Sequence, residues 1–289
     1  MTHQVVVDFS CTVGEGPVWH PDQGRLYWTD ILAGRLFWYE PGSGKSQLCY
    51  EGRTVGGFTL QADNSLLLFM DKGTVAVWDD GQIVQTIVHT IPAEIKQRFN
   101  DVTADPEGRV FAGTMPFDNV EQRSGRLYRL DRDGSYTVVL EKVGVPNGMA
   151  FTFDRRFFFF IDSLDNVVWK FDYDQETGRI SNRRAFIEFN SDDGIADGMT
   201  LDGEGNLWIA MAMGWRVVQY GPDARLKRSI ELPARFVSSL AFGGQDLSQL
   251  FVTTGRLPEG EELGSAAGTL IALRPGPIGV PELRSRIGI

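Results

Sequence analysis

One polar sequence position recurs along the chain, each time at the start of a run of apolar residues. Six segments share the same register, and they begin at Glu15, Gly56, Asn100, Asn147, Asp197 and Ser238. Their starts lie 41 to 50 residues apart, and turns and further short runs of strand type follow each of them. Four short strands per repeat, with a repeat length in the forties, are typical of a β-propeller blade. The sequence therefore predicts an all-β, six-bladed β-propeller of four-stranded blades.

The two ends of the chain indicate how the ring of blades is closed. The sixth repeat shows no fourth strand after Pro275, whereas QVVVDF, from Gln4 to Phe9, reads as a strand outside any repeat. This N-terminal strand is expected to complete the sixth blade, which would remove sheet edges that otherwise invite aggregation. Because no linker of Ser, Pro or Gly interrupts the repeats, residues 1–289 are predicted to form a single β-propeller domain.

Composition excludes several classes of protein. The chain has a formal net charge of −10 and a pI near 4.9, whereas a nucleic-acid binder normally shows a basic face. The start lacks the pattern of a signal peptide, and no apolar run reaches the roughly 18–20 residues that cross a membrane. We expect a cytoplasmic protein without a nucleic-acid or membrane partner. Cys11 and Cys49 are expected to be reduced thiols, with a disulfide between them as the alternative.

The repeated polar position predicts a site at the propeller axis. The first strand of each blade lines the central channel of a propeller, so Glu15, Asn100, Asn147 and Asp197 would meet near one end of it. Two carboxylates with one or two amide oxygens suit a hard cation such as Ca²⁺, Mg²⁺ or Mn²⁺. No histidine stands at these positions, which argues against a His-based zinc site. The alternative is that these side chains cap strands or bond to neighbouring turns.

Several stretches of the chain resemble a known family. They are GEGPVW (14–19), RFND (98–101), FAGTM (111–115), PNGMAF (146–151), FIDSL (160–164), FDYDQETGRISNRR (171–184), ADGMTLDGEGNLWIA (196–210) and FGG (242–244). Together and in this order they resemble the senescence marker protein/gluconolactonase family of regucalcin-like sugar lactonases. The resemblance extends from about Gly14 to Thr254, and it implies the same six-bladed propeller.

The resemblance also implies a metal site. In this family, one divalent cation is bound by residues that correspond to Glu15, Asn147 and Asp197. Ca²⁺ is the expected cation, and Zn²⁺, Mn²⁺, Mg²⁺ and Fe²⁺ stay open. Three protein ligands leave room for water and substrate, because a hard cation such as Ca²⁺ accepts six to eight oxygen ligands.

Substrate contacts follow from the same resemblance. Arg98 is expected to contact substrate hydroxyl groups, and Asn100 is expected to lie near both metal and substrate. A further acidic contact comes from the loop after FAGTM, where Asp118 is the counterpart by spacing and Glu121 is the competitor. These donors and acceptors suit the several hydroxyl groups of an aldonolactone.

The implied reaction is metal-dependent hydrolysis of a sugar lactone. A divalent cation can polarise the lactone carbonyl and lower the pKa of a nearby water. Asp197 is the candidate general base, and Asn100 is the second catalytic residue. The sequence contains no nucleophile elbow of the GxSxG type, so no acyl-enzyme is proposed. The alternatives are a phosphotriester (organophosphate) hydrolase on the same metal, a non-enzymatic calcium-binding regulatory protein, and a scaffold without metal. The particular sugar stays open, as does the choice between a monomer and a small homo-oligomer.

Overall fold

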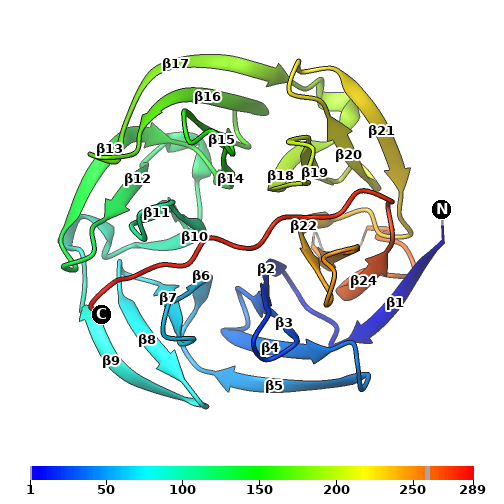
Figure 1. Cartoon of the computed structure of the whole chain (residues 1–289), viewed down its shortest axis with the longest axis horizontal. Coiled ribbons are helices and arrows are strands. Elements are labelled where there is room, and N and C mark those ends of the chain that lie inside the picture. The colour runs from blue at the N-terminus through cyan, green and yellow to red at the C-terminus, as the bar shows by residue number, and fades with distance from the viewer. Residues whose placement is uncertain (1, 258–260) are drawn as a thin grey trace. The chain divides into compact units, whose positions relative to one another are not determined.

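The computed structural model describes residues 2–257 and 261–289, and in this part of the chain it contains six antiparallel sheets of four strands. Each sheet corresponds to one sequence repeat, so the predicted six-bladed β-propeller is confirmed (Figure 1). The chain packs as two compact units with three sheets each. Unit 1 comprises Met1–Gly52 and Phe189–Glu282, and unit 2 comprises Arg53–Glu188 and Leu283–Ile289. The single domain stays a prediction.

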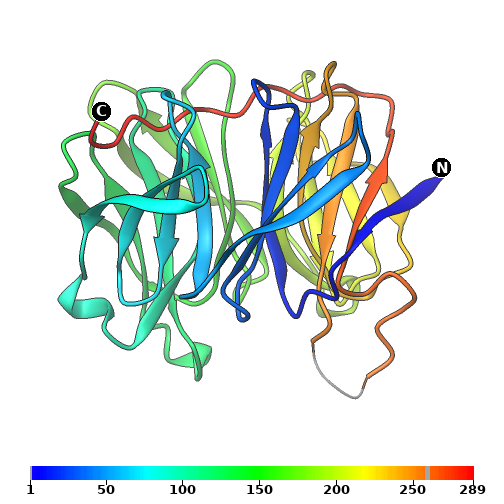
Figure 2. The ribbon, with the colours of Figure 1, turned by 90° about the horizontal axis from the view of Figure 1, so that it is seen from below.

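Unit 1 contains the first, fifth and sixth blades. Their strands are β2 (Gly14–His20), β3 (Arg25–Asp30), β4 (Arg35–Glu40) and β5 (Lys45–Glu51); β18 (Ile195–Leu201), β19 (Leu207–Ala212), β20 (Arg216–Tyr220) and β21 (Leu226–Glu231); and β22 (Val237–Gly243), β23 (Gln249–Thr254), β24 (Thr269–Leu273) and β1 (His3–Asp8). β1 pairs antiparallel with β24, beside which it lies in Figures 1 and 2. The predicted contribution of the N-terminal strand to the sixth blade is thereby confirmed.

Unit 2 contains the second, third and fourth blades. Their strands are β6 (Val55–Leu60), β7 (Leu66–Met70), β8 (Val75–Asp79) and β9 (Gln82–Val88); β10 (Gln97–Ala104), β11 (Val110–Pro116), β12 (Gly125–Leu130) and β13 (Tyr136–Val143); and β14 (Pro146–Phe151), β15 (Phe157–Asp162), β16 (Val167–Asp174) and β17 (Arg179–Glu188). The helices of the described residues are the 3-10 turns η1 (Pro92–Glu94), η2 (Val120–Gln122) and η3 (Ser191–Asp193). None of them has the length and apolar character needed to span a membrane.

Burial decides the place of each strand within its blade. The first strands β6, β14 and β22 are buried along their whole length, whereas the fourth strands β5, β9 and β21 are mostly exposed. Strands that are covered on both faces need continuous apolar runs, and strands at an exposed edge do not. In the fourth blade, for example, Phe158 packs against Phe111 and Phe151, with ring centroids 5.0 and 4.8 Å apart. The apolar runs therefore fix which strand of a repeat is innermost.

An aspartate organises the turn between the first and second strands of most blades. The Oδ1 atoms of these aspartates accept the backbone N–H two residues later, as seen for Asp63, Asp105, Asp154, Asp202 and Asp246. Aspartate favours such turns because its carboxylate can satisfy backbone donors that have no strand partner. The recurrence of this contact explains the ADPEG, TFDRR and LDGEG stretches as turn signals of the repeat.

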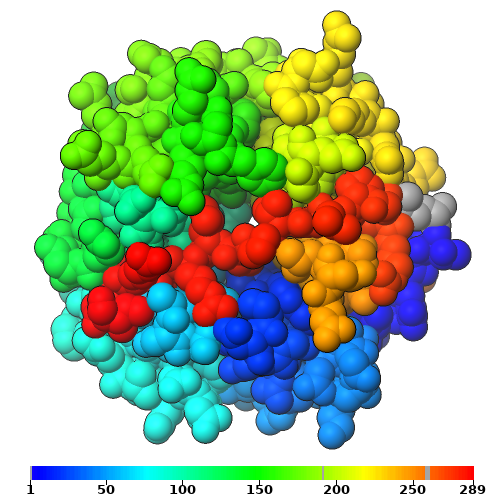
Figure 3. Space-filling view, viewed as in Figure 1, coloured from blue at the N-terminus to red at the C-terminus, as the bar shows by residue number. Residues whose placement is uncertain are grey.

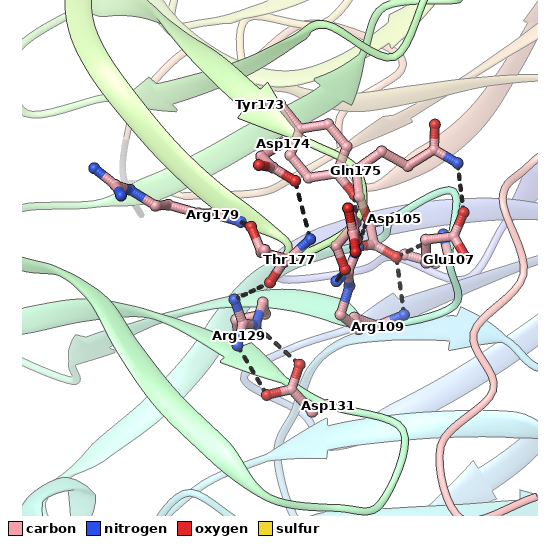
Figure 4. A network of polar contacts seen from close by, with 12 residues as sticks. Asp105, Glu107, Arg109, Arg129, Asp131, Tyr173, Asp174, Gln175, Thr177 and Arg179 are labelled. Carbon is pink, nitrogen blue, oxygen red and sulfur yellow. Dashed lines mark hydrogen bonds and ion pairs between the residues drawn. The ribbon is translucent and has the colours of Figure 1, made fainter.

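A buried ion pair links the third and fourth blades within unit 2 (Figure 4). Arg109 Nε lies 2.5 Å from Asp105 Oδ2, and the Tyr173 hydroxyl donates to the same oxygen at 2.8 Å. The guanidinium also donates to the carbonyl oxygens of Gln175 and Glu176, at 2.5 and 3.1 Å. Burial, with the neighbouring carboxylate, raises the pKa of Tyr173, so the hydroxyl stays a hydrogen-bond donor. The FDYDQETG stretch is therefore structural: it supplies the turn that Arg109 holds.

The residues at the C-terminus pack on the turns of unit 2. Ser285 N donates to Leu60 O at 2.9 Å, and the Gln61 side chain bonds both backbone groups of Ile287. Ile287 itself is fully buried among apolar residues of the second and third blades. The last residues of the chain are seen at the surface in Figure 3, in red. This segment has no counterpart in the repeat, yet it completes part of the core of unit 2.

Both cysteines carry free thiols, as expected. Burial raises the pKa of each thiol to about 12, and the nearby carboxylate of Asp30 contributes in the case of Cys11. Because the thiolate is the reactive form, both thiols are unreactive near neutral pH.

Candidate active site

Every first strand contains a register shift at the repeated polar position. The shifts fall between Glu15 and Val18, Val55 and Gly57, Phe99 and Val102, Asn147 and Met149, Ala196 and Met199, and Val237 and Ser239. A β-bulge bends the strand locally and turns a side chain out of its regular alternation, and bulges often lie next to active sites. The recurrence of the polar position in the sequence is therefore the recurrence of a bulge in the structure.

The predicted site residues at these bulges are polar and nevertheless buried. The exposed fraction is 8% for Glu15, 6% for Asn100, 5% for Asn147 and 6% for Asp197. Arg98, at the start of β10, is 9% exposed. Buried polar groups are costly unless they are hydrogen-bonded, paired or bound to a metal. Their burial at one repeat position therefore makes them candidates for a functional role within each unit.

In unit 2, the structure brings three of the predicted residues into direct contact. Arg98 Nη1 donates to Asn100 Oδ1 at 2.5 Å, and Asn100 Nδ2 donates to Asn147 Oδ1 at 2.7 Å. The same Asn100 amide group donates to Pro146 O at 2.8 Å. Asn147 Nδ2 in turn donates to Ser163 Oγ at 2.8 Å, in the turn between β15 and β16. These hydrogen bonds connect Arg98, Asn100 and Asn147, whose roles toward a metal and a substrate stay predictions, and Ser163 is an addition that the repeat did not indicate.

In unit 1, Glu15 and Asp197 occupy equivalent bulges on β2 and β18. Strand β22 packs against both of these strands, and its Ser238 Oγ donates to Gly14 O at 2.5 Å. Gly16 N donates to Glu15 Oε2 at 3.1 Å. The two carboxylates therefore stand at the same level of their blades, with one blade between them. Their meeting with Asn147 of unit 2 at one cation stays a prediction.

The two candidates for the acidic substrate contact lie on an exposed loop of unit 2. Asp118 and Glu121 flank a left-handed Asn119 (φ 57°) between β11 and β12, and both side chains are exposed. The end of this loop is anchored by Arg123, which lies 2.5 Å from Asp165 Oδ1 and 3.5 Å from Asp162 Oδ2. The anchoring turn is the same one that supplies Ser163. The choice between Asp118 and Glu121 stays open.

Asp101 is a further acidic residue that sequence reasoning did not single out. It shares the bulge of β10 with Asn100, and its Oδ1 accepts the Val102 N–H at 2.9 Å. Burial raises the pKa of this carboxyl from 3.8 to about 6. The RFND stretch contains Asp101. The pKa of the Asp101 carboxyl, however, depends on how neighbouring strands pack around it, which the stretch itself does not reveal.

The described residues contain no group of three or more His, Cys, Asp or Glu side chains arranged to hold a metal ion. The predicted ligand set differs from such a group, because it consists of two carboxylates and one carboxamide.

Comparisons with known proteins agree with this architecture. The family profile described as SMP-30/Gluconolactonase/LRE-like region matches residues 13–256. The chain is 46% identical over 294 residues to the pentonolactonase XacC of Haloferax volcanii, with 99% of both proteins covered. It is 34% identical over 257 residues to regucalcin of Xenopus laevis, with 87% of this chain and 86% of that protein covered.

Solved structures match over almost the whole chain. A luciferin-regenerating enzyme superimposes with a TM-score of 0.90 at 27% identity, covering 99% of both chains. A calcium-binding regucalcin from Agrobacterium tumefaciens gives a TM-score of 0.91 at 24% identity, covering 99% of this chain and 98% of that one, and supports the fold alone. From its profile match and its relatives, the chain belongs to the SMP-30/gluconolactonase/LRE-like family.

Proposed function

We propose that this protein hydrolyses a sugar lactone with one bound divalent cation. The observation that carries the proposal is the 46% identity, over 99% of both proteins, to a relative named as a pentonolactonase. A five-carbon aldonolactone is accordingly the first substrate to test. The buried polar residues at the strand bulges supply the chemistry that such a reaction requires.

The side chains at the bulges fit a hard cation. Glu15 and Asp197 offer carboxylates, and Asn147 offers an amide oxygen. That oxygen accepts one hydrogen bond from Asn100, and a carbonyl oxygen has two lone pairs, so it retains the capacity to bind a cation. Carboxylates that are less than a tenth exposed favour a positive partner. A divalent cation, when bound, would polarise the lactone carbonyl and acidify a water.

The remaining polar residues have roles toward the substrate. Asp197 would accept the proton of the attacking water at its carboxylate. Arg98 carries a guanidinium, a group that can only donate hydrogen bonds, and it would donate to substrate oxygens. Asn100 holds Arg98 and Asn147 in a fixed relation and would lie beside the reacting carbonyl. Asp118 or Glu121 would accept hydrogen bonds from sugar hydroxyl groups.

The decisive experiment is lactone hydrolysis by chelator-stripped protein, followed with a pH indicator. We expect loss of activity toward a pentonolactone and gluconolactone, with recovery when Ca²⁺, Mn²⁺, Zn²⁺, Mg²⁺ or Fe²⁺ is added singly. Asp197→Asn should lower kcat by about 10²–10⁴-fold, as removal of a general base does. Asp193→Asn, which loses an ion pair with Arg216 on the half-exposed η3 turn, is the matched control and should retain activity. Full activity of the stripped protein, or of Asp197→Asn, would refute the proposal.

A non-catalytic calcium-binding role is the second candidate, because the named relatives include regucalcins. It predicts selective Ca²⁺ uptake in calorimetry with no turnover of any lactone. An aryl phosphotriester in the same substrate panel tests the phosphotriesterase alternative, which would give turnover of that substrate and none of the lactones.

A further inference from the structure

We propose that Ser163 is a positioning residue that, together with Asn100, holds the Asn147 amide so that its oxygen, rather than its NH2 group, faces the cation. The inference rests on the proposed function, because it concerns the metal site described there. Ser163 lies 16 residues from Asn147, outside the repeated polar position, and its Oγ is 2.8 Å from Asn147 Nδ2.

The directions of the hydrogen bonds around Asn147 follow from two neighbouring groups, one of which can only donate and one of which can only accept. The Arg98 guanidinium can only donate, so the Asn100 atom that faces it is the oxygen. The Pro146 carbonyl can only accept, so the other end of the Asn100 amide is the NH2 group. That NH2 group faces Asn147 at 2.7 Å, which requires an oxygen there. The NH2 group of Asn147 therefore points to Ser163.

Ser163 is itself held in place by the turn between β15 and β16. Its backbone N–H donates to Val145 O at 2.9 Å. The preceding residue, Asp162, accepts the N–H groups of Gly144 and Val145 at 2.9 and 3.0 Å. These contacts tie the turn to the chain just before β14, on which Asn147 lies. The hydroxyl is thus a rigidly placed acceptor for the Asn147 amide.

The amide plane of Asn147 is consequently fixed at both ends, by Asn100 at the oxygen and by Ser163 at the nitrogen. Without Ser163, only the oxygen end would be held, and the carboxamide would be able to tilt or rotate away from the cation. Partners that orient metal ligands typically change metal affinity by 10–100-fold. A neutral amide depends on such orientation, because only one of its two terminal atoms can bind a cation.

The test is calorimetric titration of Ca²⁺ and of Mn²⁺ into chelator-stripped wild-type and variant proteins. Ser163→Ala should weaken the affinity by about tenfold, and Ser163→Thr, which retains a hydroxyl, should restore it to within about twofold. Ser135→Ala removes a hydroxyl from an exposed turn and serves as the matched control with unchanged affinity. Thermal unfolding of the metal-free proteins checks that the variants are folded.

The Asn147→Asp variant serves as a second background, which shows whether Ser163→Ala weakens cation binding through the orientation of the amide or through a general structural effect. In Asn147→Asp, the two terminal atoms are both oxygens, so Ser163→Ala should change the affinity by no more than about twofold. An equal tenfold loss in this background would overturn the inference, as would unchanged cation binding by Ser163→Ala in the native background. If the wild-type protein binds neither cation, the metal site of the proposed function falls as well. Binding by the wild type with an unaffected Ser163→Ala variant removes this inference alone.

Discussion

Partial burial has an electrostatic consequence at Asp101. Its carboxyl has a pKa raised to about 6 in the folded chain, above the ordinary value of 3.8, because burial disfavours the ionised form. A raised pKa means that the folded state holds the proton more tightly than the unfolded state. The contribution of Asp101 to stability is therefore fully present below about pH 4 and is lost as the pH rises through about 6.

We expect Asp101→Asn to stabilise the metal-free protein at pH 7 and to leave its stability nearly unchanged at pH 4. The gain at pH 7 should be about 1–3 kcal/mol in the free energy of unfolding, since one pKa unit corresponds to ~1.4 kcal/mol. Urea unfolding at the two pH values measures it. Asp133→Asn is the control, because hydrogen bonds from Ser135 lower the pKa of that exposed carboxyl, so no gain at pH 7 is expected. A gain of equal size at both pH values would contradict the explanation.

Single residues differ in how far the sequence could predict them. The equivalent places of Glu15, Asn147 and Asp197 at buried strand bulges were predictable, because a repeat places equivalent positions at equivalent points of each blade, whereas their common cation stays a prediction. Ser163 was not, because its contact with Asn147 depends on how the turn after β15 folds back beside β14. The perturbed pKa of Asp101 was equally hidden, since it reflects the neighbouring inner strands rather than the residue type.

Neighbouring first strands approach so closely at the bulges that some positions admit only glycine. A Cβ atom on Gly56 would lie 1.9 Å from Phe99 O and 2.4 Å from Phe99 C, both backbone atoms of β10. This explains why the second repeat has glycine where others have a polar side chain. The contact cannot be relieved by a rotamer change, because the obstructing atoms belong to the main chain.

We therefore predict that Gly56→Ala destabilises the protein by about 1–3 kcal/mol or more, as overpacking does. Gly42→Ala is the matched control, because a Cβ there meets nothing within 4 Å, and its effect should be within about 0.5 kcal/mol. Chemical unfolding of the two variants makes the comparison. Equal stabilities would show that β6 and β10 can move apart at no cost.

The loop between β11 and β12 is held to the fourth blade by one long side chain. Arg123 forms ion pairs with Asp162 and Asp165, whereas Arg183 of β17 forms an ion pair with Asp165 and lies over the ring of Trp169. Phe117, at the start of the loop, is 48% exposed and offers a cleavage site for chymotrypsin. The rate of chymotryptic cleavage after Phe117 therefore reports how firmly the loop is held.

Arg123→Gln should accelerate chymotryptic cleavage after Phe117 several-fold, because a loop that opens more often is cut more often. Arg183→Gln should leave the rate at the wild-type level. Mass spectrometry of the first fragments identifies the site. Identical rates for the two variants would mean that the backbone, and not Arg123, holds the loop.

Blade boundaries were partly readable from the sequence. The repeats placed each first strand correctly, but the strands begin one to three residues before the polar position, as at Gly14 for Glu15 and Gln97 for Asn100. The residues ahead of the bulge pair with the second strand as well, so the polar side chain marks an irregularity inside the strand rather than its start. The sequence composition does not distinguish a polar residue at the start of a strand from one at an irregularity inside the strand.

The C-terminal segment shows what a repeat cannot predict. Residues after Pro275 follow no blade pattern, so their place could not be derived from the period. Ile287 nevertheless fills a gap in the core of unit 2, and the Gln61 side chain bonds its backbone on both sides, at 2.9 and 3.2 Å. Such packing depends on three-dimensional complementarity with the second and third blades.

Ile287→Ala should lower the free energy of unfolding by about 2–5 kcal/mol, the usual range for removal of a buried isoleucine side chain. Ile289→Ala, two residues later and 59% exposed, should have little effect. Thermal denaturation distinguishes the two variants. A small effect of Ile287→Ala would indicate that the tail merely covers unit 2 and is not part of its core.

The pairing of β1 with β24 joins the first and the last of the described strands. About 260 residues separate Asp8 from Thr269, and a ribosome adds ~5–20 residues per second, so β1 waits roughly 15–50 s for its partner. During this interval its backbone donors and acceptors face water or other nascent chains. The sheet that contains β1 can therefore be completed only after the strands of the other five sheets have been synthesised.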